Sequence, residues 1–289
     1  MHWHVRGQII VLDRPIIAGI LNVTPDSFSD GGRFESPSAA LAHAQHMLAQ
    51  GADIIDIGGE STRPQGASPV SVDEENMRVL PVIDALARVH PDAVLSIDTV
   101  KSEVADRALL AGVHIVNDVS GFRLDPAMAG VCARHRAGVV LTHSRGDVSD
   151  MGTYQSARYG DDPVDEILGE LQACVRAAED GGVDRRAIAV DPGIGFAKRS
   201  EHSLAILAAL PRLAAWGLPV YVGVSRKRFV GEITGVPNAA ERVHGSVGAA
   251  VAALARGARV FRVHDVGPAR QALDVAWAIL RSNAAAAPR

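Results

Sequence analysis

Charged and amide side chains stand at the ends of short apolar runs at five places in the sequence. They are Asp98, Asn117, Asp191, Lys227 and Arg262. Carboxylate and amide oxygens can accept paired N–H donors from a flat heterocycle, whereas ammonium and guanidinium groups hold phosphate or carboxylate oxygens. A lone Asp in such a place is more often a helix N-cap. Because charges beside an apolar core lose solvation unless they meet partners, the recurring set favours one shared ligand site.

The apolar runs indicate a parallel sheet. Each is rich in Val and Ile, too short for a helix and too uniformly apolar for a one-sided strand, which is typical of strands covered on both faces. The eight runs are 16–21, 54–57, 94–97, 114–116, 139–141, 187–190, 220–224 and 260–263.

Helix-length segments rich in Ala and Leu separate these runs. They span 38–50, 72–89, 101–111, 125–136, 162–180, 201–215, 239–255 and 268–280. The eightfold alternation predicts an α/β protein and favours a (β/α)8 TIM barrel over an open doubly wound sheet. In such barrels the active site lies at the carboxyl ends of the strands, where the five polar residues stand.

Helix boundaries agree with this interpretation. Candidate N-caps are Ser36, Ser71 and Asp125. Glycines that stand just past helix ends, where a left-handed residue is favoured, are Gly51, Gly112, Gly181 and Gly257. We expect a single domain over 1–289, with residues 1–15 forming a short hairpin that caps the barrel and 284–289 forming a frayed tail.

Composition narrows the class of function. The chain has 289 residues, of which 47% are hydrophobic and 21% charged, so it can bury a large core. A net charge of −4 and no apolar stretch of membrane-spanning or signal-peptide length argue against nucleic-acid and membrane partners. Cys132 and Cys174 form neither a disulfide framework nor a zinc-site spacing. We therefore expect a cytoplasmic enzyme that acts on small molecules.

The polar strand ends belong to longer motifs. In chain order these are NVTPDSFSDGG at 22–32, GGESTRP at 58–64, SIDT at 96–99, NDVSG at 117–121, DPGIGF at 191–196, SRK at 225–227 and RVHD at 262–265. Together they resemble the dihydropteroate synthases, the folate-pathway transferases that join a pterin to p-aminobenzoate. The resemblance runs over nearly the whole chain.

The resemblance implies a pterin pocket. It assigns to Asp191 the paired acceptance of two ring-edge N–H groups, with Asn117 beside it. Asp98 would lie near the reactive side of the ring, Lys227 would donate to the ring, and Arg262 would lie over its face. Asp98, Lys227, Arg262 and Asn22 are the implied catalytic residues.

An anion pocket is implied beside the pterin, for the diphosphate of 6-hydroxymethyl-7,8-dihydropterin diphosphate. Mg²⁺ is the expected cofactor, with Asn22 as the residue next to the metal. Arg63, Arg262 and His264 would contact phosphate oxygens, although Arg63 alone could equally be a solvated surface residue. Asp56 could support Asn22 or the metal through water.

The family's chemistry begins with loss of diphosphate, and the amine of p-aminobenzoate then adds to the dihydropterin cation. The implied p-aminobenzoate pocket consists of Phe28, Thr62, Pro64, Phe196, Lys227 and Ser225. Phe28 and Phe196 could otherwise be packing residues. The long loops 22–36 and 58–70 would close over this pocket. A homodimer through the last helices is also implied, and the resemblance marks the protein as a sulfonamide target.

The fifth strand departs from the family pattern. Thr142 stands where a Met usually packs on the pterin, so apolar contact is lost. His143 persists and is more often a structural hydrogen bonder than a catalyst. Two alternatives stay open, a pterin-dependent methyltransferase and a catalytically silent pterin-binding homologue. The methyltransferases lack the TPDSFSDGG, STRP and SRK features found here.

Overall fold

Eight parallel strands form a nearly closed barrel. The computed structural model describes residues 1–24, 37–60 and 70–285. The strands are β3 (Ile16–Asn22), β4 (Ile54–Gly58), β5 (Val94–Asp98), β6 (Ile115–Asp118), β7 (Gly138–Thr142), β8 (Ile188–Asp191), β9 (Tyr221–Val222) and β10 (Val260–Val263). Their order is β8-β7-β6-β5-β4-β3-β10-β9, and a parallel bridge between Val190 and Val220 brings the two end strands together. The predicted TIM barrel is confirmed.

Strand register sets the site. Asn22 pairs with Gly58, Gly58 with Asp98, and Asp98 with Asn117. Because paired residues of parallel strands point to the same side of the sheet, one layer at the carboxyl end of the barrel carries an amide, a carboxylate and a second amide. Because Gly58 has no side chain, the space between Asn22 and Asp98 stays open.

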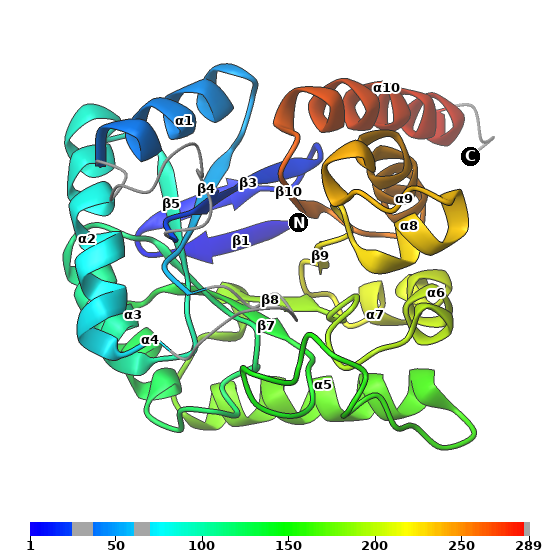
Figure 1. Cartoon of the computed structure of the whole chain (residues 1–289), viewed down its shortest axis with the longest axis horizontal. Coiled ribbons are helices and arrows are strands. Elements are labelled where there is room, and N and C mark those ends of the chain that lie inside the picture. Colours follow the sequence, from blue (N-terminus) through cyan, green and yellow to red (C-terminus); the bar gives the residue numbers. More distant parts are fainter. Residues whose placement is uncertain (25–36, 61–69, 286–289) are drawn as a thin grey trace.

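Helices surround the barrel as an outer ring (Figure 1). They are α1 (Pro37–Ala49), α2 (Val72–Val89), α3 (Ser102–Leu110), α4 (Met128–His135), α5 (Pro163–Asp180), α6 (Ser200–Ala208), α7 (Leu210–Ala214), α8 (Arg228–Thr234), α9 (Val243–Ala255) and α10 (Val266–Ala285). The helix expected over 201–215 is divided into α6 and α7, with Pro211 in the first turn of α7. The helix expected over 239–255 begins as a short 3-10 turn, and α8 was not predicted.

Two of the predicted helix ends are wrong. Ser71 is the N-cap of α2, as expected, and accepts from the Glu74 amide. Asp125, however, does not cap α4, which begins at Met128; its Oδ2 accepts instead from the amide of Ser102, the first residue of α3. After α5 the left-handed residue is Gly182 rather than Gly181. Ser36 lies outside the described residues.

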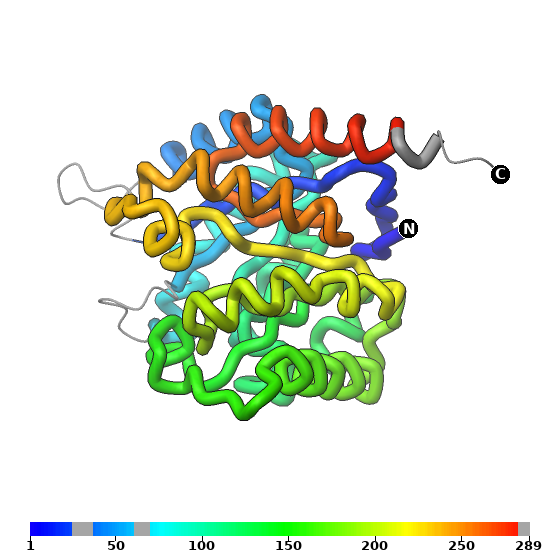
Figure 2. The backbone as a smooth tube through the Cα atoms, turned by 90° about the vertical axis from the view of Figure 1, so that its right-hand side faces the viewer, coloured from blue at the N-terminus to red at the C-terminus, as the bar shows by residue number. Residues whose placement is uncertain are grey.

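An N-terminal hairpin, β1 (His2–Val5) with β2 (Gln8–Val11), covers the amino ends of the strands. The fully buried Trp3 donates from Nε1 to the carbonyl of Ala187, just before β8. Figure 2 shows this N-terminal segment on one side of the barrel. At the other end of the chain, α10 continues to Ala285, into the segment expected to be a tail. Within the described part of the chain, no helix has the length and apolar character to cross a membrane.

Candidate active site

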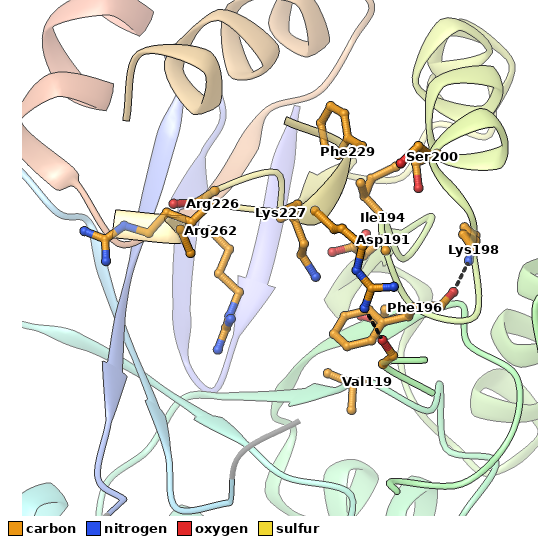
Figure 3. Close-up of a pocket in the computed structure, with 18 of the residues that line it drawn as sticks. Val119, Asp191, Ile194, Phe196, Lys198, Ser200, Arg226, Lys227, Phe229 and Arg262 are labelled. Atoms are coloured by element: carbon orange, nitrogen blue, oxygen red, sulfur yellow. Dashed lines mark hydrogen bonds between the residues drawn. The ribbon is translucent and has the colours of Figure 1, made fainter. Parts of the chain in front are cut away.

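A cavity of about 900 Å³ opens at the carboxyl ends of the strands. Several of the residues predicted from the sequence line it, namely Asn117, Asp191, Phe196, Ser225, Lys227, Arg262 and His264. Figure 3 shows the labelled side chains of Asp191, Phe196, Lys227 and Arg262 grouped around this space. Thr142 also lines the cavity and is buried. Five strand ends and the turns after them thus converge on one polar space.

Arg262 joins two carboxylates across the barrel mouth. Its Nε donates to Oδ2 of Asp56 at 2.6 Å, and its Nη2 donates to Oδ2 of Asp98 at 2.5 Å. The same Asp56 oxygen accepts from Nδ2 of Asn117 at 3.1 Å. Oδ2 of Asp56 therefore orients Arg262 and Asn117. Its Oδ1 is buried and has no hydrogen-bond partner among the described residues, so support of Asn22 or a metal through water stays a prediction.

Burial changes the proton affinity of two predicted site carboxylates, those of Asp98 and Asp191. It raises the pKa of Asp98 to about 7, against the opposing effect of Arg262. It also raises the pKa of Asp191 to about 6, although the Gly193 amide donates to Asp191 Oδ1 at 2.7 Å and Lys227 lies near. Both carboxyl groups therefore exchange protons closer to neutral pH than an exposed aspartate does.

Lys227 stands at the junction between the turn after β9 and helix α8. It is the N-cap residue of α8, and its Nζ lies 4.0 Å from the centre of the Phe196 ring. An ammonium over an aromatic face is a favourable contact. Burial lowers the pKa of Lys227 to about 8, with Asp191 acting in the opposite direction. Phe196 thus packs under a cation and also contacts the apolar cluster of Val100, Val119 and Met151.

The turns after β9 and β10 hold each other. Ser225 Oγ lies 3.0 Å from Nδ1 of His264 and accepts from the His264 amide at 3.1 Å. Arg226 donates from Nε and Nη2 to the two carboxylate oxygens of Asp265 at 3.0 and 2.6 Å. These paired contacts fix the positions of Ser225, Lys227 and His264 relative to one another.

Asn22 ends β3 next to this network. A Cβ added to Gly58 would lie 3.8 Å from Asn22 Oδ1 and 3.6 Å from Asp98 Cβ. Asn22 and Asp98 are thus neighbours across Gly58. Neither lines the large cavity itself; Asp98 is tied to it through Arg262. Phe28, Thr62, Arg63 and Pro64 lie outside the described residues, as do most of the two expected closing loops.

Two polar residues beside the cavity were not singled out from the sequence. Lys198 is almost completely buried and donates to the carbonyls of His143 and Phe196. Arg242 donates to the carbonyls of Arg226 and Lys227. One signal could have drawn attention to Lys198: only three of the 29 basic residues are lysines, Lys101, Lys198 and Lys227.

Known proteins share both the sequence and the architecture. The model of the family described as "Pterin binding enzyme" matches residues 18–264. A dihydropteroate synthase from Synechocystis is 45% identical over 93% of this chain and 91% of its own length. The structure of the Xanthomonas albilineans dihydropteroate synthase with 4-aminobenzoic acid is 44% identical, with a TM-score of 0.89 over 99% of both chains.

A second structure from Xanthomonas albilineans, a dihydropteroate synthase in complex with 7,8-dihydropteroate, is 41% identical and has a TM-score of 0.87 over 100% of both chains. Likeness of this extent covers the strand ends that carry the cavity as well as the barrel. The chain therefore belongs to the dihydropteroate synthase family of pterin-binding transferases.

Proposed function

We propose that the protein condenses 6-hydroxymethyl-7,8-dihydropterin diphosphate with p-aminobenzoate, giving 7,8-dihydropteroate and diphosphate. The convergence of Asn117, Asp191, Lys227 and Arg262 on one cavity, with Asp98 bound to Arg262, carries this proposal. Acceptors for a heterocycle edge and cations for an anion stand together there, as the reaction needs. The family membership supports the same substrates.

Asp191 is the proposed acceptor for the pterin edge. Its Oδ1 takes one backbone N–H, from Gly193, and its other oxygen lies near Gly223, a residue whose missing side chain leaves the space open. Asn117 supplies an amide that Asp56 orients through Nδ2. Lys227, which lines the same cavity, donates to the ring, and Arg262 lies where it can cover the ring or contact the diphosphate.

The reaction then requires cleavage of the bond between the pterin methylene carbon and the diphosphate oxygen. The bonding electrons leave with diphosphate, and positive charge develops on the dihydropterin. Asp98, which lies beside Arg262, stabilises that charge. The amine nitrogen of p-aminobenzoate then bonds to the methylene carbon and loses one proton. Phe196, Ser225 and Lys227 are proposed to hold p-aminobenzoate, and His264 and Arg262 to hold diphosphate oxygens.

Mg²⁺ fits this site as an ion carried mainly by the substrate. Among the described residues no group of three His, Cys, Asp or Glu side chains could hold a metal. Mg²⁺ usually keeps several waters and binds one or two protein oxygens together with substrate phosphates. The amide oxygen of Asn22, beside Gly58, can supply such a ligand. Bound there, Mg²⁺ would neutralise charge on the diphosphate.

The apolar surface of α10 supports a proposed homodimer. Val275 and Ile279 stand one helical turn apart and are 62% and 58% exposed. Sedimentation of the protein with both residues changed to Ser should then give a monomer where the unmodified chain gives a dimer. A cytoplasmic location is supported by the two free cysteines, Cys132 and Cys174.

The proposed activity is tested with purified protein, both substrates and Mg²⁺. Diphosphate release that depends on p-aminobenzoate is the expected result, and a sulfonamide should compete with p-aminobenzoate. Asp191→Ala or Lys227→Ala should lower kcat/KM on the order of 100-fold, because each leaves a buried polar contact unmade. No diphosphate release overturns the proposal, and methyl transfer from methyltetrahydrofolate would assign the methyltransferase alternative.

A further inference from the structure

Lys198 is a buried basic side chain that the proposed reaction does not use, and burial lowers its pKa well below the ordinary value of a lysine. It is 1% exposed, and its ammonium lies within hydrogen-bond distance of three acceptors. These are the His143 imidazole at Nδ1 (2.6 Å), the His143 carbonyl (3.2 Å) and the Phe196 carbonyl (3.1 Å). No carboxylate of the described residues pairs with it within 4.0 Å. Three donors of one ammonium thus meet three acceptors on two different segments.

The segment that Lys198 holds is a strained turn between β8 and α6. Gly193, Gly195 and Ala197 all have left-handed backbones, with φ of 70°, 78° and 46°. The left-handed conformation is unfavourable for Ala, so the surrounding contacts must maintain it. A Cβ added to Gly193 would lie 1.9 Å from the His143 carbonyl oxygen. The turn is therefore pressed directly against the end of β7.

His143 connects this contact to the outer rim of the barrel. Burial lowers the pKa of His143 to about 4, so the ring is neutral near pH 7 and carries one proton. The carboxylate of Glu170 beside Nε2 can only accept, which assigns the ring proton to Nε2 and leaves Nδ1 to accept from Lys198. Nε2 lies 3.0 Å from Oε2 of Glu170, which accepts this proton's hydrogen bond. Arg145 in turn donates from Nε to the same carboxylate at 3.0 and 3.2 Å. The hydrogen bonds from Lys198 through His143 and Glu170 to Arg145 thus form one connected network in which each polar atom has a defined donor or acceptor role.

The turn places the Phe196 ring under the Lys227 ammonium, 4.0 Å from the ring centre. The Phe196 carbonyl is held by Lys198, so movement of that carbonyl would move the ring and its contact with Lys227. Figure 3 shows Lys198 with its hydrogen bond, and Asp191 and Phe196 lie between Lys198 and Lys227 in this view. Tyr159 also holds the turn, by donating to the next carbonyl, that of Ala197, at 3.1 Å.

We propose that Lys198 is a positioning residue that sets the Phe196 ring, and through it the Lys227 ammonium, by tying the turn 192–197 to His143. This proposal rests on the proposed function, since Phe196 and Lys227 are assigned there to substrate binding. The chain otherwise uses arginine for 26 of its 29 basic residues. A compact ammonium suits this place because its three donors diverge, whereas a guanidinium presents them in one plane.

A double-mutant cycle tests whether Lys198 acts through Phe196. Lys198→Met keeps the unbranched apolar stem, one atom shorter, but removes the donors, and we expect it to raise the KM for p-aminobenzoate on the order of tenfold. In a Phe196→Leu background the same change should alter KM less than about twofold, since the ring is already absent. Equal effects in both backgrounds would show that Lys198 does not work through the ring.

Tyr159→Phe is the matched control, because it removes one hydrogen bond from the same turn without touching the Phe196 carbonyl. Its effect on KM should be small and additive with Phe196→Leu. If Tyr159→Phe reproduces the effect of Lys198→Met, then loss of any hydrogen bond to the turn has the same effect on KM. The specific role of Lys198 is then overturned. The dissociation constant of a pterin alone, measured in parallel, separates ring placement from general loss of the site.

A measurement on the unchanged protein decides the matter if Lys198→Met does not fold. Nitrogen-15 NMR of labelled histidine should find His143 neutral, with its proton on Nε2, near pH 7. A His143 that is protonated on Nδ1 is incompatible with donation from Lys198 and contradicts the proposal. This result does not depend on turnover, so an inactive wild-type protein would defeat the proposed function and leave this contact standing.

Discussion

Two carboxylates hold Arg262, and they differ in what else they contact. Asp56 is fully buried in the barrel, and its Oδ2 serves both Arg262 and Asn117. Asp98 stands at the strand end, with part of its side chain exposed. Its carboxylate accepts a hydrogen bond from Arg262. Asp56 is thus suited to orient the guanidinium, while Asp98 stays available to the ligand.

Changing Asp56 to Asn should separate these two roles. The amide removes a charge from beside a buried guanidinium, and breaking a buried ion pair costs about 3–5 kcal/mol. We expect lower stability and a fall in kcat/KM on the order of 100-fold, measured by urea unfolding and by diphosphate release. Asp106→Asn removes a carboxylate from a partly exposed pair with His135 and Arg134 and should change stability by about 1 kcal/mol or less. Equal outcomes for the two variants would contradict the orienting role.

The pKa values of Asp191 and Lys227 predict a pH window for pterin binding. Only ionised Asp191 accepts two N–H groups, so affinity should rise as pH passes about 6, and the ionisation of Asp98 near pH 7 adds to the same acidic limb. Protonated Lys227 donates, so affinity should fall as pH passes about 8. Calorimetric titration with a pterin between about pH 5 and about pH 9.5 measures both limbs. Lys227→Met should abolish the basic limb and keep the acidic one; affinity that is flat with pH would refute the assignment.

At the scale of elements, one arginine holds the turn that carries Lys227. Arg242, just before α9, donates from Nη1 to the carbonyls of Arg226 and Lys227 at 3.1 and 3.4 Å. Its Nε donates to the Val236 carbonyl at 2.9 Å, and Nη2 donates to that of Pro237. The guanidinium therefore joins the start of α8 to the segment that follows it.

Gly231 of α8 makes room for this guanidinium. A Cβ there would lie 2.5 Å from Arg242 Nε. An Ala in a helix normally stabilises by about 1 kcal/mol relative to Gly. At Gly231, however, the displaced hydrogen bonds should outweigh that gain, with a net loss of about 1–2 kcal/mol and a higher KM. Gly248→Ala in α9, where nothing lies within 4 Å, should instead stabilise. Thermal unfolding of both variants gives the comparison, and a stabilised Gly231→Ala would disprove the packing argument.

The sequence predicted the elements whose burial is uniform and missed those that depend on distant contacts. The strands could be found because both of their faces are buried, and the site residues because they end those strands. Helix α8 has only seven residues, with Gly231 at its middle and Gly235 as its C-cap, so it lacks a periodic apolar signal. The roles of Asp56, Lys198 and Arg242 depend on acceptors that lie in other segments of the folded chain, which no local pattern indicates.

At the scale of the whole molecule, the two ends of the barrel are filled differently. The carboxyl end is polar and open, whereas the amino end is closed by an apolar cluster around the N-terminal hairpin. That cluster contains Trp3, Val5, Leu12, Ile16, Ala18, Ile54, Ile115, Val140, Ala189, Tyr221 and Val260. Gly138 at the start of β7 admits the hairpin, since a Cβ there would lie 2.4 Å from Val5 Cγ1. Stability and substrate binding are thus assigned to opposite ends.

Trp3→Ala tests that separation. Loss of a fully buried indole and its hydrogen bond to Ala187 should cost about 3–5 kcal/mol in the free energy of unfolding. Trp3→Phe keeps most of the apolar contact and should cost less. Because the hairpin lies at the amino ends of the strands, KM for both substrates should stay unchanged in the fraction that remains folded. A shifted KM in Trp3→Phe, with the fold intact by circular dichroism, would mean that the closed end also shapes the open one.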